Sequence, residues 1–110
     1  MTKPFSLAGL IDGGWRDCAF EPFRPGIEMC TLVEGSPTVA LLKYAPGGHA
    51  PLHRHTGLET VIVLEGSQRD EHGLYEKGAV VFNPAQSQHS VTSDDGCIVL
   101  IQWHSPIEFL

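Results

Sequence analysis

The sequence has no cluster of basic residues and no pairs of closely spaced cysteines. Seven Lys and Arg stand against thirteen Asp and Glu in 110 residues, which gives a formal charge of −6. A protein of this charge repels a nucleic-acid backbone or an anionic membrane, so we expect neither as a partner. Cys18, Cys30 and Cys97 are odd in number and far apart, unlike a disulfide framework or a thiolate zinc site. Reduced thiols are the simplest interpretation, and they favour a cytoplasmic protein.

Long apolar and helical segments are missing as well. The longest N-terminal apolar run, from Phe5 to Ile11, is interrupted by Ser6 and Gly9. It is too short for the core of a signal peptide and far too short to span a bilayer. No window of helical length keeps an apolar period of about 3.6 residues. These absences predict a cytoplasmic protein with no membrane helix and little α-helix of any kind.

Short apolar segments separated by turn residues fill the chain instead. Twelve glycines and eight prolines divide it into short runs, which is typical of a β-sandwich or β-barrel. Strands are expected at 27–33, 38–44, 59–64, 79–82, 88–93 and 97–103. Hydrophobic residues make up 42% of the sequence, enough for the core of one domain. We therefore predict an all-β, single-domain barrel over residues 20–110, with residues 1–19 as an arm that packs on the barrel or on a partner subunit.

Three of the six histidines form a pattern with one carboxylate. His53 and His55 are two residues apart, Glu59 opens the next apolar run, and His89 lies at the start of strand 88–93. Residues two apart share a face on a strand, whereas on a helix about 200° separates them. A barrel can bring the other two side chains to the same point. Imidazole with a carboxylate suits Fe2+, Zn2+, Mn2+, Ni2+ or Cu2+, so these four residues are candidate ligands of one divalent metal ion.

The alternative is that these side chains are exposed on loops, because His and Glu are commonly found at the surface. The longer pattern favours the metal. Gly47-x5-His53-x-His55-x3-Glu59-x6-Gly66 resembles the first cupin motif at every spacing. The second cupin motif resembles Gly78-x5-Pro84-x-Gln86-x2-His89-x3-Ser93, with Gln86 in place of the usual glycine and Ser93 in place of the usual asparagine. This resemblance implies a jelly-roll (RmlC-like) β-barrel with His53, His55, Glu59 and His89 as metal ligands.

A closer resemblance, to the ChrR-like cupin domains, extends from Trp15 to Trp103. It is carried by Pro22-Phe23-x-Pro25-Gly26, Leu41-Leu42-x-Tyr44-x-Pro46-Gly47, Val63-Leu64-Glu65-Gly66 and Asp70-Glu71-His72-Gly73-x-Tyr75-x-x-Gly78. That family includes the cupin half of zinc anti-sigma factors and small dioxygenases that cleave acetylacetone or dihydroxyacetophenone. The anti-sigma proteins carry a further N-terminal helical zinc domain, for which we find no room, so we do not expect their role here.

Two functions agree with this resemblance. The first is a metal-dependent enzyme, a non-haem Fe(II) dioxygenase acting on a small diketone or hydroxyketone-like substrate. The alternative is a non-catalytic zinc-binding cupin that binds or senses a small ligand, and a third reading is a plain barrel whose site is vestigial. The sequence identifies no separate catalytic acid or base. Cupins are commonly dimers, so a homodimer is expected.

Other side chains near the pattern are assigned more ordinary roles. His49, His72 and His104 are expected outside the ligand set, with His72 in a hairpin turn. Of Gln102 and Trp103, one is expected to point into the barrel. A set of mostly branched residues is expected to form the core and make the metal's surroundings apolar: Val61, Ile62, Val63, Val80, Val81, Phe82, Val91 and Ile98.

Overall fold

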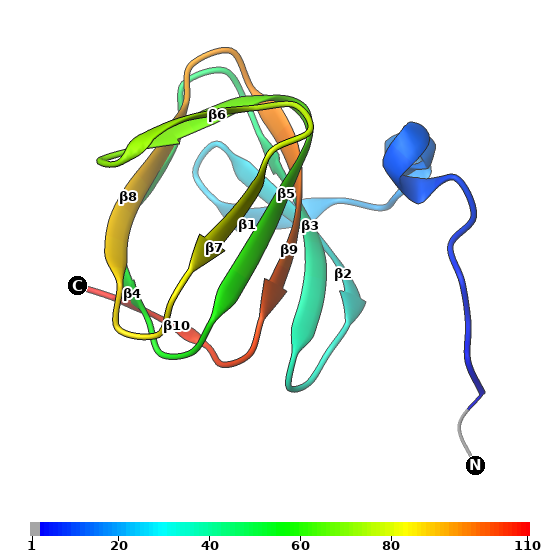
Figure 1. Cartoon of the computed structure of the whole chain (residues 1–110). Coiled ribbons are helices and arrows are strands. Elements are labelled where there is room, and N and C mark those ends of the chain that lie inside the picture. The colour runs from blue at the N-terminus through cyan, green and yellow to red at the C-terminus, as the bar shows by residue number, and fades with distance from the viewer. Residues whose placement is uncertain (1–2) are drawn as a thin grey trace.

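The structure, a computed structural model, describes residues 3–110. Within this range two short 3-10 helices are followed by ten strands that curl around a common interior (Figure 1). The helices are η1 (Leu10–Asp12) and η2 (Gly14–Asp17). The strands are β1 (Glu21–Arg24), β2 (Ile27–Val33), β3 (Thr38–Tyr44), β4 (Gly48–His55), β5 (Glu59–Asp70), β6 (Gly73–Glu76), β7 (Val80–Asn83), β8 (Gln88–Ser93), β9 (Cys97–Trp103) and β10 (Ile107–Phe109).

The strands pair antiparallel in the order β1-β2-β3-β9-β5-β8-β4-β10, and β6 and β7 each pair with β5. Strand β5 joins the two layers of the barrel. Its first part pairs with β7 and β9, and its last part pairs with β6 and β8. At Gly66 the strand bends with a φ of 72°, and a Cβ atom there would overlap the carbonyl oxygen of Gly96. Glycine alone accepts both the positive φ and this close backbone approach, so Gly66 permits the sheet to turn.

Inward-facing side chains of both layers form the main core. Alternation along the strands brings mostly β-branched and other aliphatic side chains to the interior, as a pleated sheet requires. The cluster includes Ile27, Ala40, Leu42, Val61, Val63, Val91, Val99 and Ile101. Leu42, Val61, Val91, Val99 and Ile101 of this core surround the same interior space as His53 and His89.

A second apolar cluster lies on the outer face of the barrel. Leu41, Leu64 and Ile98 are buried there, although they point away from the main core. Leu10 and Trp15 pack against them, so the N-terminal segment covers this part of the sheet. The division of the chain into an arm of residues 1–19 and a barrel of residues 20–110 stays a prediction.

Four expected strands are confirmed with the same bounds: 27–33, 38–44, 88–93 and 97–103. The strand expected at 59–64 is longer, since it passes the bend at Gly66 and continues to Asp70. The strand expected at 79–82 is β7 (Val80–Asn83), one residue later, and no bounds were predicted for β4 (Gly48–His55), which carries His53 and His55. Strands β1, β6 and β10 were not predicted at all. Each has three or four residues, which is too short for an alternating pattern to be visible.

The prediction that Val80 and Phe82 belong to the core is wrong, since 49% and 63% of these residues are exposed. They lie on β7, which among residues 3–110 pairs with β5 alone. Val81 and Asn83 face inward, so the alternate side chains of the strand point outward, where no described element buries them. Val61, Val63 and Val91 are buried in the main core as expected, whereas Ile98 is buried in the outer cluster and Ile62 packs against that cluster.

In the described residues, no helix has the length and apolar character needed to cross a membrane. The expected homodimer and the cytoplasmic location stay predictions.

Candidate metal centre

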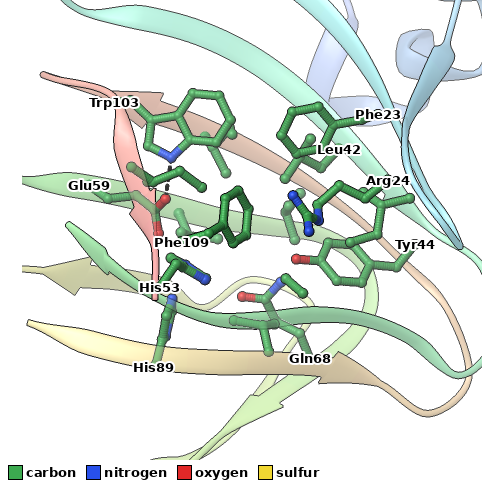
Figure 2. Close-up of a pocket in the computed structure, with 17 residues that line it drawn as sticks. Phe23, Arg24, Leu42, Tyr44, His53, Glu59, Gln68, His89, Trp103 and Phe109 are labelled. Atoms are coloured by element: carbon green, nitrogen blue, oxygen red, sulfur yellow. Dashed lines mark hydrogen bonds between the residues drawn. The ribbon is translucent and has the colours of Figure 1, made fainter.

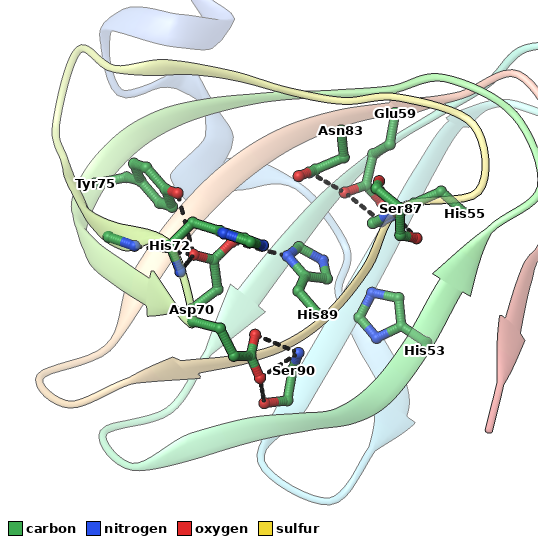
Figure 3. A network of polar contacts seen from close by, with 12 residues as sticks. His53, His55, Glu59, Asp70, His72, Tyr75, Asn83, Ser87, His89 and Ser90 are labelled. Carbon is green, nitrogen blue, oxygen red and sulfur yellow. Dashed lines mark hydrogen bonds and ion pairs between the residues drawn. The ribbon is translucent and has the colours of Figure 1, made fainter.

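Neighbouring strands bring three histidines to one point in the interior. His53 and His55 share a face of β4, and His89 on β8 lies directly opposite His53 in the strand pairing. Residues opposite one another in an antiparallel pair point to the same side of the sheet. The His89 ring centroid lies 4.6 Å from that of His53 and 4.7 Å from that of His55. All three residues are buried, and one nitrogen from each lies within 4.8 Å of the other two (Figure 3).

The Nδ1 atom of each histidine is engaged away from the cluster. His53 Nδ1 donates to the carbonyl oxygen of Pro51 at 2.8 Å, and His89 Nδ1 donates to the Asp70 carboxylate at 2.9 Å. A carbonyl or carboxylate oxygen accepts only, so each Nδ1 carries the hydrogen. The neutral rings therefore keep the free lone pair on Nε2.

The Nδ1 atom of His55 also carries the hydrogen and donates it away from the cluster. Its Nδ1 lies 3.2 Å from the Ser87 carbonyl oxygen and 3.1 Å from the Ser87 hydroxyl oxygen. The Ser87 hydroxyl donates its own hydrogen to the carbonyl oxygen of Pro84, so it too accepts from His55. A backbone hydrogen bond also holds His55 beside Ser87, because the backbone N–H of His55 donates to the Ser87 carbonyl oxygen at 2.9 Å.

The loop before β8 contains one strained residue. Gln86 has a φ of 75°, at the position where the cupin motif has glycine. This left-handed conformation costs a non-glycine residue about 1–2 kcal/mol. The Gln86 N–H donates to the His55 carbonyl oxygen at 2.7 Å, and this bond helps to hold the loop against the strain. The departure from the motif therefore leaves the position of His55 intact.

Glu59 lies beside the histidines and is held from both sides. It pairs across the sheet with Asn83 on β7 and with Trp103 on β9. Asn83 Nδ2 donates to Glu59 Oε1 at 3.0 Å, and Trp103 Nε1 donates to Glu59 Oε2. The Asn83 amide and the Trp103 indole N–H thus satisfy one oxygen each of the buried Glu59 carboxylate. Its Oε1 also lies on the side of His55, so one carboxylate oxygen is turned toward the cluster.

Asp70 orients His89 from behind. While its Oδ2 accepts from His89, its Oδ1 accepts from the backbone N–H of His72 at 2.8 Å and from the hydroxyl of Tyr75 at 3.0 Å. Burial would raise the pKa of Asp70, but these hydrogen bonds, led by that of His89, hold it below its ordinary value. A ligating histidine commonly donates its second nitrogen to a carboxylate in this way.

The residues present fit a divalent cation. The Nε2 atoms of His55 and His89 are fully buried and have no hydrogen-bond partner among the described residues. Burial lowers the pKa of His53, which favours the neutral, ligating form of that ring. Glu59 Oε1 lies 3.2 Å from His55 Nε2. Two ligands of one ion, each about 2.1 Å away, would be about 3 Å apart, so this pair has a suitable spacing. The three-histidine group could hold a metal ion.

A cavity opens from the histidines into the barrel (Figure 2). His53, Glu59 and His89 line one end of it. Its walls are mostly apolar, with Leu42, Val61, Val99 and Ile101 among them. The enclosed space measures about 30 Å³, which holds roughly two water molecules. Apolar walls of this kind suit a small organic ligand.

The C-terminal strand β10 covers the mouth of this cavity. It pairs with β4, so that Phe109 lies opposite His53. Their ring centroids are 5.6 Å apart. Arg54 on β4 also forms an exposed ion pair with Glu108 on β10 at 2.5 Å. Neither Phe109 nor this covering strand was expected from the sequence.

The structure brings together three of the four expected ligands, His53, His55 and His89. Glu59 contacts His55 but is not part of the three-histidine group, so the four-residue ligand set stays a prediction. The remaining histidines, His49, His72 and His104, are exposed and lie outside the group. Trp103 is the residue of the Gln102–Trp103 pair that points inward, as the alternation requires.

Sequence reasoning missed the residues that support the ligands. Asp70 was assigned only to a hairpin, although a carboxylate at a turn beside a long strand was a usable signal. Asn83 and Trp103 could be found only from strand register, which places them on either side of Glu59.

Comparison with known proteins gives the family. The model of the ChrR cupin-like domain matches residues 14–106. The chain belongs to this family. It is 30% identical over 109 residues to the anti-sigma-E factor ChrR of Cereibacter sphaeroides, a match that covers 96% of this chain and 51% of that protein. The chain thus spans about half the length of the curated relative it matches.

Solved structures agree with this assignment. This chain resembles a chain in the crystal structure of Rhodobacter sphaeroides SigE in complex with the anti-sigma ChrR. The TM-score is 0.76 and the identity 26%, and the match covers 88% of this chain and 56% of the other. This chain also resembles an acetylacetone dioxygenase from Acinetobacter johnsonii, with a TM-score of 0.80 and 14% identity over 100% of this chain and 78% of that one. At 14% identity the second likeness concerns the fold alone.

Proposed function

We propose that this cupin is a metal-dependent enzyme acting on a small organic molecule, with the metal held by His53, His55, Glu59 and His89. The observation that carries the proposal is the orientation of the histidines. All three Nδ1 atoms are engaged as donors, so the Nε2 lone pairs face one another in a buried space. Buried acceptors without donors are costly, and a divalent cation would satisfy them together.

The chain's own residues would hold and enclose the reacting molecule. Asp70 fixes the orientation of His89, while Asn83 and Trp103 fix the carboxylate of Glu59. Apolar walls would exclude water from the cavity, and Phe109 covers its mouth. A bound divalent ion would polarise substrate oxygen atoms and, if it is iron, supply redox chemistry with dioxygen. We infer a dioxygenase acting on a diketone or hydroxyketone-like substrate as the specific reaction.

A second function, a zinc-binding cupin that binds or senses a small ligand, is favoured by a different observation. The relative at 30% identity is an anti-sigma factor, and this chain matches about half of it. In this case zinc would stabilise the barrel and the cavity would only bind its ligand, since zinc has no redox chemistry.

The identity of the metal and the uptake of dioxygen separate the two functions. Protein purified anaerobically is expected to contain near-stoichiometric iron and to consume dioxygen when β-diketones or hydroxyketones are added. The His89→Ala variant is expected to do neither, because it lacks one of the ligands. Near-stoichiometric zinc, with no dioxygen uptake even after reconstitution with Fe(II), would reject the dioxygenase and favour the second function.

A further inference from the structure

The cavity contains hydrogen-bond donors that no protein group uses. Arg24, Tyr44 and Gln68 line it from β1, β3 and β5, beyond the histidines. Figure 2 shows their polar ends pointing into the same space, and among the residues drawn only Trp103 and Glu59 share a hydrogen bond. Tyr44 and Gln68 are each only 6% exposed. Among the described residues no side-chain hydrogen bond involves the Arg24 guanidinium or the Tyr44 hydroxyl, so both can donate to an acceptor that enters the cavity.

Arg24 is a positioned cation without a counter-ion in the protein. Its guanidinium carbon lies 3.8 Å from the ring centroid of Phe109, so the aromatic ring holds the group at the mouth of the cavity. Among residues 3–110 the ion pairs of arginine and lysine involve other side chains, and Arg24 takes part in none. The one carboxylate that lines the cavity, Glu59, is already bound by Asn83 and Trp103.

Tyr44 strengthens this preference for an anion. Burial raises the pKa of Tyr44 far above its ordinary value, and the nearby thiol of Cys97 and carboxylate of Glu59 act in the same direction. The phenol therefore keeps its hydrogen and can donate it to a carboxylate oxygen that enters the cavity. The Gln68 amide hydrogen-bonds to the thiol of Cys97, a weak acceptor, and presents its remaining polar atoms on the same side of the cavity.

We propose that the cavity selects a small organic carboxylate that also carries a carbonyl or hydroxyl oxygen, such as a 3-oxo acid. The carboxylate lies against Arg24 and Tyr44, and the other oxygen points to the histidine cluster. Arginine's planar fork pairs with both oxygens of a carboxylate, which neutral ketones cannot reproduce. This inference rests on the proposed function, since it places the second oxygen at the metal. Phe109 contacts both Arg24 and His53, so its ring must move before one ligand can reach both side chains.

The size of the cavity limits the ligand. Its enclosed space of about 30 Å³ is smaller than a molecule of several heavy atoms, so entry requires side chains at the mouth to move. Phe109 is 38% exposed and Arg24 is half-buried, so both have room to move outward. The small cavity therefore limits the proposed carboxylate ligand to a short carbon chain.

Two ligands of nearly equal shape test this inference. Acetoacetate has a carboxylate oxygen where acetylacetone has a methyl group. Titration calorimetry with zinc-loaded protein reads binding alone, without turnover. We expect acetoacetate to bind at least tenfold more tightly than acetylacetone, the advantage of a charge-assisted hydrogen bond. Arg24→Gln should remove this advantage, and Arg24→Lys should retain part of it, because lysine keeps the charge and loses the fork.

Arg16→Gln is the matched control, because Arg16 also stacks on an aromatic ring, Trp15, but does not line the cavity. It should leave the preference for acetoacetate unchanged. Zinc content is measured on every sample. Equal binding of the two ligands by wild-type protein that holds zinc would overturn this inference and leave the metal site standing. If wild-type protein holds no zinc, iron or other divalent ion, the proposed function itself fails.

Discussion

Replacing His53 and His55 by alanine is expected to abolish the stabilisation that a divalent metal gives to the wild-type protein. A ligand that binds only the folded state stabilises it by about 4 kcal/mol at a thousand times its Kd. For a domain of this size that corresponds to a rise in Tm of roughly 15 °C. The double variant loses two of the three lone pairs that face the cluster, so its Tm should not respond to added metal. Thermal unfolding with excess metal and with a chelator measures both values.

The matched control removes two histidines that lie elsewhere. His72 and His104 are exposed and outside the cluster, so their double replacement by alanine should keep the full metal-dependent rise in Tm. The same rise in all three proteins would mean that the metal binds outside the cluster. The absence of any rise in the wild type would support the vestigial site.

Asp70→Asn is expected to weaken metal binding by 10- to 100-fold without removing any ligand. The Asp70 carboxylate accepts from His89 Nδ1, and both partners are nearly fully buried. It also accepts from the Tyr75 hydroxyl and from two backbone N–H groups of the hairpin turn. The neutral amide has one acceptor oxygen and no charge, so it holds the His89 ring less firmly and makes Nε2 a weaker ligand. Competition with a chelator of known affinity gives the change in Kd.

The same substitution at Asp94 provides the comparison. Asp94 pairs with Arg69 at 2.9 Å, but both side chains are more than half exposed and lie away from the histidines. Asp94→Asn should therefore leave metal affinity within about twofold of wild type, since an exposed ion pair contributes little. Equal metal affinity in Asp70→Asn and wild type would contradict the positioning role of Asp70.

The fold was largely readable from local patterns. Alternation and turn residues gave the bounds of four strands, because those strands are long enough for their periods to be visible. The exposure of Val80 and Phe82 could not be read, since a branched apolar residue has the same local signal on an edge strand as in a core. What differs is the number of neighbouring strands, which is a property of the assembled sheet.

In the candidate site, too, local patterns predicted some residues and strand register determined the others. The spacing of His53 and His55 gives their common face from local geometry alone, and the motif adds His89. The supports of the site lie on strands far apart in the sequence, so their proximity depends on register. Arg24 and Phe109 are in contact because β10 pairs with β4 and brings Phe109 to the mouth of the cavity. No local sequence pattern predicts that contact.

Anomalous scattering from crystals of the metal-loaded protein shows whether the three histidines bind a metal ion. Data collected on both sides of the absorption edge of the metal locate the ion without assumptions about its ligands. We expect one peak per chain, bounded by the Nε2 atoms of His53, His55 and His89, with a carboxylate oxygen of Glu59 at bonding distance. A chain with no peak at the three histidines, or with its peak at an exposed histidine such as His49, would contradict this expectation.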